Sequence, residues 1–306
     1  MNIIATIIPI FAVIFLGWLA REKGFMPPEF LGPANRLVYY LAIPAMIFRA
    51  ISKASLKTEF NIMVIIITLL SILTVFVFVW GIASIKNIKQ RCRGTFIQSS
   101  FHGNLGYIGF AVSYYFLGSE GFVRASIIGG FVMLLQNTLA VVALQFYSNS
   151  ASAKENRLKI VVKILNNPVI LSAIAGILFS VAEIPIPLVA DRVLKIISDF
   201  ALPVALLIIG ASLSFELMRL PVFLVLLTGI VKLVLLPCLG FFLYRISGIT
   251  SHDFLPGLIL LASPTATIAY VMAKEMKGDA DFAVAAISTS TILSALTFSV
   301  WLNIAG

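Results

Sequence analysis

The chain consists largely of long apolar runs separated by short polar links, and this alternation limits what it can fold into. Each run has roughly 18 to 27 residues, the length that crosses the apolar core of a bilayer as an α-helix. There are ten of them, at residues 2–20, 33–51, 60–84, 94–117, 121–147, 166–182, 187–213, 219–243, 253–274 and 279–303. β-Barrel strands would be much shorter and would alternate strictly. The sequence therefore predicts an all-α polytopic membrane protein with ten transmembrane helices.

Composition supports this fold class and excludes several others. Hydrophobic residues make up 60% of the chain and charged residues 11%, whereas a soluble domain carries about 25% charged residues. The first run has no Lys or Arg before it and no small-residue cleavage site after it, so we expect a retained helix and no signal peptide. Cys92 in a basic link and Cys238 in the eighth run predict neither a disulfide nor a metal site. We expect no cofactor.

The basic residues indicate topology. The net charge is +9, but Lys and Arg beside helix ends report orientation and do not point to nucleic acid. Sorted by alternate links, 14 basic residues fall on one side and 7 on the other, and Lys232 lies inside the eighth run. The richer side is expected to be cytoplasmic. Both termini of this cytoplasmic or inner membrane protein are therefore predicted to lie outside.

An internal repeat relates the two halves of the chain. The residues Pro9, Gly17, Pro28 and Pro44 match Pro168, Gly176, Pro187 and Pro203, each pair being 159 positions apart. Pro and Gly have backbone requirements that are hard to replace, so chance does not explain four matches at one offset. The predicted organisation is a first five-helix repeat at 1–147, a cytoplasmic linker at 148–163 and a second repeat at 164–306. Because five is odd, the second repeat is expected to be inverted in the membrane.

Helix-breaking and polar residues interrupt the fourth and ninth runs. The offset of 159 places Asn104 on Ser263 and Leu105 on Pro264, so the two interruptions are predicted to be equivalent. We expect each run to form two half-helices, with Asn104 and Ser263 capping the second half and Pro264 in its first turn. Half-helix N-termini at mid-membrane suit an anion. The candidate binding residues here are Gly103, Asn104, Gly106, Ser263, Pro264, Thr265 and Thr267.

Lys232 lies deep in the eighth run, where an ammonium group by default marks a functional site. It could bind an anionic substrate. Alternatively, it could offset the negative C-terminal ends of the half-helices, where another transporter would hold a cation. The sequence leaves both readings open.

Three further polar residues are candidates for the site or for helix contacts. His102 could relay protons, although a lone membrane histidine more often bonds to a neighbouring helix. Gln136 and Asn137 lie in the middle of the fifth run and should face the bundle interior. They could line the site or tie the fifth helix to the fourth. Ser290, Ser294 and Thr297, spaced as one helix face, are expected to be packing surface.

Two long segments resemble the auxin efflux carrier family, which includes bacterial malate or malonate permeases and the plant PIN-FORMED carriers. They are "LGWLAREKGFMPPEFLGPANRLVYYLAIPAMIFRAIS" and "NPVILSAIAGILFSVAEIPIPLVADRVLKIISDFALPVALLIIGASLS", supported by "GNLG" in the fourth run. The resemblance implies scaffold helices 1, 2, 6 and 7 that also form a homodimer. It also implies transport helices 3–5 and 8–10, with helices 4 and 9 crossing at an organic-anion site, and elevator-like alternating access. Here "SPTA" stands where other members often have Asn-Pro.

The sequence thus predicts a secondary transporter of a small organic anion, a carboxylate similar to auxin, malate or malonate, and not an enzyme. A symporter or exchanger of the same inverted-repeat fold, coupled to H⁺ or Na⁺ and carrying another substrate, is the alternative, but no Asp or Glu lies near the centre of a run. A receptor would usually carry an added soluble module. An intramembrane enzyme would need a nucleophile or metal motif, and none occurs.

Overall fold

The computed structural model describes residues 3–55, 59–85, 88–148, 166–216 and 222–306. Within these ranges all regular structure is helical, apart from one isolated pair of bridged residues. The all-α expectation is confirmed. The predicted linker at 148–163 lies, except for Ser148, outside the described residues.

The helices of the first half follow the apolar runs. They are α1 (Ile3–Glu22), α2 (Pro28–Leu37), the π-helix η1 (Val38–Ala42), α3 (Ile43–Ser52), α5 (Ile62–Ile85), α6 (Gln90–Phe101), the π-helix η2 (Leu105–Gly109) and α7 (Phe110–Tyr147). The fourth and fifth runs merge into α7, which contains a non-helical residue, Gly118, with φ 73°. Glycine adopts this conformation without a Cβ penalty, so the chain turns where the link between the two runs was expected.

The second half has a similar succession of elements. They are α9 (Pro168–Val181), α10 (Leu188–Asp199), α11 (Ala201–Ala211), α12 (Val222–Ile230), the π-helix η5 (Val231–Leu235), α13 (Leu236–Ile246), α14 (Ser251–Ala262), α15 (Ile268–Glu275) and α16 (Ala280–Ala305).

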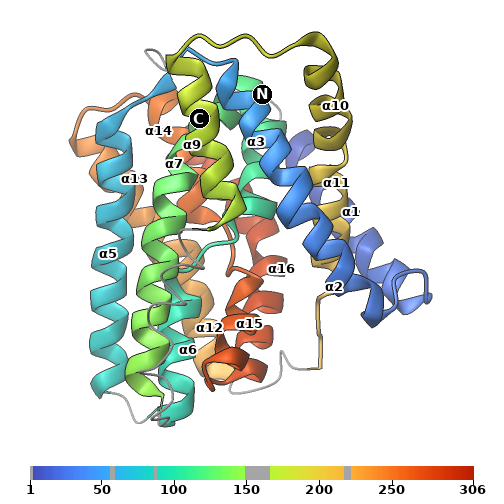
Figure 1. Cartoon of the computed structure of the whole chain (residues 1–306). Coiled ribbons are helices and arrows are strands. Elements are labelled where there is room, and N and C mark those ends of the chain that lie inside the picture. The colour runs from blue at the N-terminus through green and yellow to red at the C-terminus, as the bar shows by residue number, and fades with distance from the viewer. Residues whose placement is uncertain (1–2, 56–58, 86–87, 149–165, 217–221) are drawn as a thin grey trace.

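Six helical stretches among the described residues are long and apolar enough to cross a membrane. They are Ile3–Glu22, Ile62–Ser84, Leu105–Tyr147, Leu188–Ala211, Val222–Ile246 and Ala280–Ala305. Pro168–Val181 and Ser251–Ala262 are shorter apolar helices. Both chain ends lie at the same end of the bundle, with α5 on one side and α10 and α2 on the other (Figure 1). The chain is thus a multi-helix membrane protein, while ten spans remain a prediction.

Two helix pairs pack in matching ways. α1 packs on α11 and α3 on α9. A Cβ at Gly17 would overlap the backbone of Leu207, and a Cβ at Gly176 would lie 2.9 Å from Ile51 Cβ and 3.3 Å from the Phe48 carbonyl oxygen. Small residues allow such close helix contacts. Positions 17 and 176 are 159 apart, and so are positions 48 and 207. The contact of Gly17 with Leu207 therefore corresponds, after exchange of the two halves, to the contact of Gly176 with Phe48.

The ends of the same helices are also joined in matching ways. Arg21 Nη1 donates to the carbonyl oxygens of Ala211 (2.8 Å) and Leu213 (3.2 Å). Ser180 Oγ donates to the carbonyl oxygen of Ala54 (2.7 Å). Positions 21 and 180, and 54 and 213, again differ by 159. The three bonds satisfy carbonyl groups at or just beyond the ends of α11 and α3, where intrahelical donors are lacking.

We group the elements by these contacts. The flanking helices are α1, α2, η1, α3, α9, α10 and α11. The crossover helices are α5, α6, η2, α7, α12, η5, α13, α14, α15 and α16. Buried apolar side chains from both groups form one continuous core.

Candidate functional site

The two interruptions predicted from the sequence meet inside the protein. α6 ends at Phe101 and η2 begins at Leu105, while α14 ends at Ala262 and α15 begins at Ile268. Gly103 and Thr265 form an antiparallel bridge between the two gaps. The Asn104 amide donates to the Pro264 carbonyl (2.7 Å), and the Ala266 amide donates to the His102 carbonyl (2.8 Å). These bonds satisfy backbone groups that would be costly to leave unpaired in an apolar interior.

The register of this crossover differs from the predicted one. Asn104 and Ala266 take the same part in the two backbone bonds, since each donates its amide across to the other gap, and the bridge pairs Gly103 with Thr265. In both pairs the two residues are 162 positions apart. The prediction that Asn104 corresponds to Ser263, and Leu105 to Pro264, is therefore wrong by three residues. The offset is 159 at the helix ends, so the second half has three more residues before its break. The Pro and Gly matches lie before this point and could not reveal it.

The predicted caps also need correction. Ser263 follows the last residue of α14 and its hydroxyl donates back to the Ile259 carbonyl (2.9 Å), so it ends one helix instead of starting the next. Pro264 lies in the extended link, not in a first helical turn. Thr267 precedes α15 but its side chain makes no capping hydrogen bond. Asn104 does stand directly before η2, yet only its backbone carbonyl accepts bonds there, from Ile108 (3.2 Å) and Gly109 (3.0 Å).

Side chains from the last helix of each half hold the bridge in place. Gln136 in α7 accepts from the Gly103 amide (3.2 Å) and donates to the Phe101 carbonyl (3.0 Å). Ser290 in α16 accepts from the Thr265 amide (3.0 Å). The Gln136 contacts favour the helix-tying reading.

Ser290 and Ser99 belong to the crossover but were not predicted from the sequence. The Thr265 hydroxyl donates to the Ser99 carbonyl (2.9 Å), which ties α15's link to the last turn of α6. Ser290 was expected to be packing surface because its spacing with Ser294 and Thr297 is typical of helix contacts. Its position in the tenth run, opposite the broken ninth run, was the available signal.

Lys232 is completely buried in η5. Its ammonium donates to the carbonyl of Leu261 (2.7 Å), in the last turn of α14. The C-terminal end of a helix carries a partial negative charge and unpaired carbonyls. None of the described carboxylates forms an ion pair with Lys232. This contact supports the reading in which Lys232 offsets a half-helix end.

Three buried side-chain atoms of the residues named at the crossover have no hydrogen-bond partner among the described residues. They are Nδ2 of Asn104, in a residue 5% exposed, Nδ1 of His102, in a residue 4% exposed, and Oγ of Ser99, in a residue 0% exposed. Buried polar groups are normally paired. Gly106, Thr267 and Asn137 are half-buried. Asn104 therefore offers a free amide donor where a half-helix begins.

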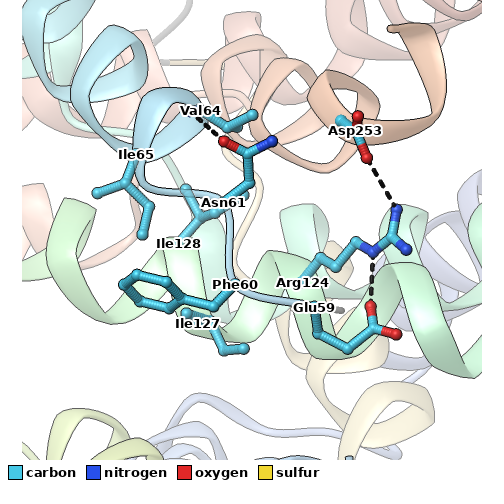
Figure 2. A pocket seen from close by; sticks show the side chains of 9 residues that line it. All are labelled: Glu59, Phe60, Asn61, Val64, Ile65, Arg124, Ile127, Ile128 and Asp253. Carbon is cyan, nitrogen blue, oxygen red and sulfur yellow. Dashed lines mark hydrogen bonds and ion pairs between the residues drawn. The ribbon is translucent and has the colours of Figure 1, made fainter. Parts of the chain in front are cut away.

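Two cavities among the described residues lie away from the crossover. One, of about 240 Å³, is lined by Glu59, Phe60, Asn61, Val64, Ile65, Arg124, Ile127, Ile128 and Asp253. Figure 2 shows its Arg124 guanidinium between the carboxylates of Glu59 and Asp253. A second, of about 690 Å³, lies between α3, α7 and the junction of α10 with α11, and includes Arg49, Tyr114, Phe122 and Leu202. Neither wall contains His102, Asn104 or Lys232, so the crossover is closed off from both.

Comparison with known proteins identifies the family. A family model described as "Membrane transport protein" matches residues 2–302. The chain belongs to this membrane transport protein family. A "Putative malonate transporter" of Rhizobium meliloti is 27% identical over 97% of this chain and 93% of its own length. An "Uncharacterized transporter" of Methanothermobacter thermautotrophicus is 22% identical over 97% and 96%. "Uncharacterized transporter MJ1031" of Methanocaldococcus jannaschii is 23% identical over 94% of each chain.

Membership of the membrane transport protein family confirms the resemblance to the auxin efflux carriers. The match runs through both interruptions and through Lys232. The relatives are named as transporters, which agrees with the expectation that the chain is not an enzyme. A small-molecule substrate and a multi-pass membrane location follow from the family.

Proposed function

We propose that this protein is a secondary transporter of a small organic carboxylate, with its binding site at the crossover. The observation that carries the proposal is the free Nδ2 donor of Asn104, buried at the start of η2 beside the bridged gaps. The first turn of a helix leaves amides without intrahelical acceptors and carries a partial positive charge. Together with the amide of Asn104, these groups suit a carboxylate.

The remaining site residues take two roles in this proposal. His102, Asn104, Gly106 and Thr267 face the substrate. Gly103, Gln136, Ser263, Pro264, Thr265 and Lys232 shape and hold the crossover, and Asn137 supports the wall beside Gln136. The division follows the hydrogen bonds: the side chains of Gln136, Thr265, Ser263 and Lys232 already bond to protein atoms.

The fold proposed for this function has ten transmembrane helices in two inverted repeats. The matched contacts support it, because the contact that Gly17 makes in one half corresponds to the contact that Gly176 makes in the other. The hydrogen bonds of Arg21 and Ser180 correspond in the same way, since their acceptor carbonyls are also 159 positions apart. A twofold axis in the membrane plane would produce such reciprocity. The repeats would be residues 1–147 and 164–306, with helices 4 and 9 broken and crossing.

The flanking helices would be a scaffold and the crossover helices a transport unit that moves past it. Two hydrogen bonds between described residues join the two groups, one between Tyr107 and Asn35 and one between Ser214 and Ser288. A further backbone bond lies within the chain segment that connects the groups. Every ion pair among the described residues lies within one group. An interface with few polar contacts suits elevator-type sliding. We further propose homodimerisation through the scaffold and a cell-membrane location with both termini outside.

The test is uptake by purified protein in proteoliposomes. Radiolabelled malonate, malate and indole acetate are supplied with no ion gradient, with a H⁺ gradient and with a Na⁺ gradient. Malonate is included because a relative carries that name. We expect saturable uptake of at least one carboxylate, and stimulation by either gradient would identify the coupled symporter. Absence of uptake and binding of all three, under every gradient, would refute the anion proposal.

A further inference from the structure

The two half-helices that leave the crossover are exposed to very different extents. On one side, Leu105, Tyr107 and every residue from 108 to 113 are buried, and exposure begins only at Tyr114 (41%) and Tyr115 (47%). On the other, the short helix α15 exposes a face formed by Ile268 (37%), Tyr270 (37%) and Val271 (42%). In an inverted repeat these half-helices would have equivalent places. Their different burial therefore reflects different positions relative to the flanking helices.

The flanking helices cover the first half-helix directly. η2 contacts α11. A Cβ at Gly106 would lie 4.0 Å from Ile43 Cδ1, at the start of α3. α15, in contrast, packs mainly on α16 and α6, which belong to its own group.

One side-chain hydrogen bond fastens this covered half-helix. The Tyr107 hydroxyl, at the third residue of η2, donates to Oδ1 of Asn35 in α2. Tyr107 is 5% exposed. The other described hydrogen bond between the groups uses the Ser214 amide, which follows α11 in the chain that leads toward α12. Among the described residues, the Tyr107–Asn35 bond is thus the one that joins a helix of each group by side chains.

The other half-helix also has a tyrosine at its third residue, Tyr270, but it is not fastened to the flanking helices. Its ring lies 5.9 Å from the ammonium of Lys274, in the same helix. The flanking position 159 residues after Asn35 is Leu194, which has no side-chain acceptor. A bond like that of Tyr107 is therefore available at one end only.

We propose that the Tyr107–Asn35 hydrogen bond is a latch that holds the first half-helix against the flanking helices and leaves α15 uncovered. Release of the latch allows the crossover helices to shift, which uncovers the region around Ile43 and covers the face of Ile268, Tyr270 and Val271. This inference rests on the proposed movement of the two groups, but it needs no particular substrate. The latch biases a transporter toward one of its two states, since the opposite end has no matching bond.

The experiment measures thiol labelling of purified protein in nanodiscs, where both membrane faces are accessible. Cys92 and Cys238, the two cysteines of the chain, are first replaced by alanine. Single reporters are then introduced as Ile43→Cys, at a position 1% exposed, or Tyr270→Cys. Each reporter is combined with Tyr107→Phe or with Asn35→Leu, and labelling rates with a polar maleimide are compared.

Loss of one buried hydrogen bond should shift the two-state ratio by about fivefold. We expect the labelling rate at position 43 to rise by up to about fivefold and the rate at position 270 to fall. Opposite changes distinguish a movement from loosening of the fold, which would raise both rates. The double variant Tyr107→Phe/Asn35→Leu should give no larger effect than either single change, because both remove the same bond.

Tyr244→Phe is the matched control. Tyr244 is fully buried and its hydroxyl bonds to Thr68, but both residues belong to the crossover helices. It should leave the ratio of the two labelling rates unchanged. Unchanged rates in both latch variants, or rates that rise together at both reporters, would overturn the latch. Failure to transport any carboxylate would refute the proposed substrate class and leave these labelling results interpretable.

Discussion

The ammonium of Lys232 donates to the backbone carbonyl of Leu261 at 2.7 Å, in a site closed to solvent. This bond connects η5 to the end of α14, directly before the crossover. A buried lysine without a carboxylate partner is costly, and its bond to a helix C-terminus is required to offset that cost.

Replacing Lys232 with methionine should therefore destabilise the protein. Because the helix end compensates the buried charge in the native protein, the main effect of the change is to leave the Leu261 carbonyl without its donor, at a cost of about 1–3 kcal/mol. We expect a lower melting temperature in detergent, by a few degrees. Lys195→Met, at a half-exposed lysine paired with Asp199, is the control and should have little effect. An unchanged melting temperature with lost transport would instead assign Lys232 to the substrate.

Gln136 should matter more for stability than Ser290. Gln136→Leu removes two hydrogen bonds to the chain around the crossover, from the Gly103 amide and to the Phe101 carbonyl. Ser290→Ala removes one such bond, from the Thr265 amide, and a local bond to the Ile287 carbonyl of its own helix (3.2 Å). With about 1 kcal/mol for each bond between elements, the melting temperature should fall about twice as far for Gln136→Leu. Equal or reversed effects would show that the bridge is not held from both sides as described.

Asn104 should affect transport without affecting stability. Its side-chain amide has no partner to lose, so Asn104→Ala should leave the melting temperature within about 1 °C of the wild type. If the amide donates to a carboxylate, half-saturation should need about tenfold more substrate. The matched comparison is Asn137→Ala, which removes a half-buried side-chain amide next to Gln136 in α7; its melting temperature and half-saturation are measured in the same way. A large loss of stability in Asn104→Ala would contradict the free-donor assignment.

Arg124 should stabilise one end of the crossover helices. Its guanidinium contacts Glu59 before α5 and Asp253 in α14, and it also bonds to the His252 carbonyl (3.2 Å). Arg124→Met removes this cation from the Glu59 carboxylate, whose side chain is 12% exposed, and loss of one partner from a mostly buried ion pair is destabilising. We expect a larger fall in melting temperature than for Asp253→Asn, whose side chain is 38% exposed. Equal small effects would mean that solvent screens the whole cluster.

Much of the fold follows from the sequence because apolar length and Pro and Gly positions act locally. The breaks at 102–104 and 263–267 were predicted, since Gly103, Gly106 and Pro264 disfavour continuous helix. The three-residue shift in register was not, because it arises between Gly240, which still matches Gly81 at an offset of 159, and Ser263, and no Pro or Gly match at that offset lies between them. The actual partners of the break, such as Ser290 and Leu261, depend on tertiary packing that no local pattern encodes. Ser263 was misassigned because serine caps N-termini in general but here bonds backward.

The most direct test is malonate counterflow. Proteoliposomes containing folded wild-type protein are loaded with unlabelled malonate and diluted into a trace of labelled malonate, which needs no knowledge of the coupling ion. The crossover site predicts transient accumulation of label, reduced about tenfold at low substrate in Asn104→Ala. No accumulation with malonate, malate or indole acetate, in vesicles whose protein retains its melting transition, would contradict a carboxylate site at the crossover.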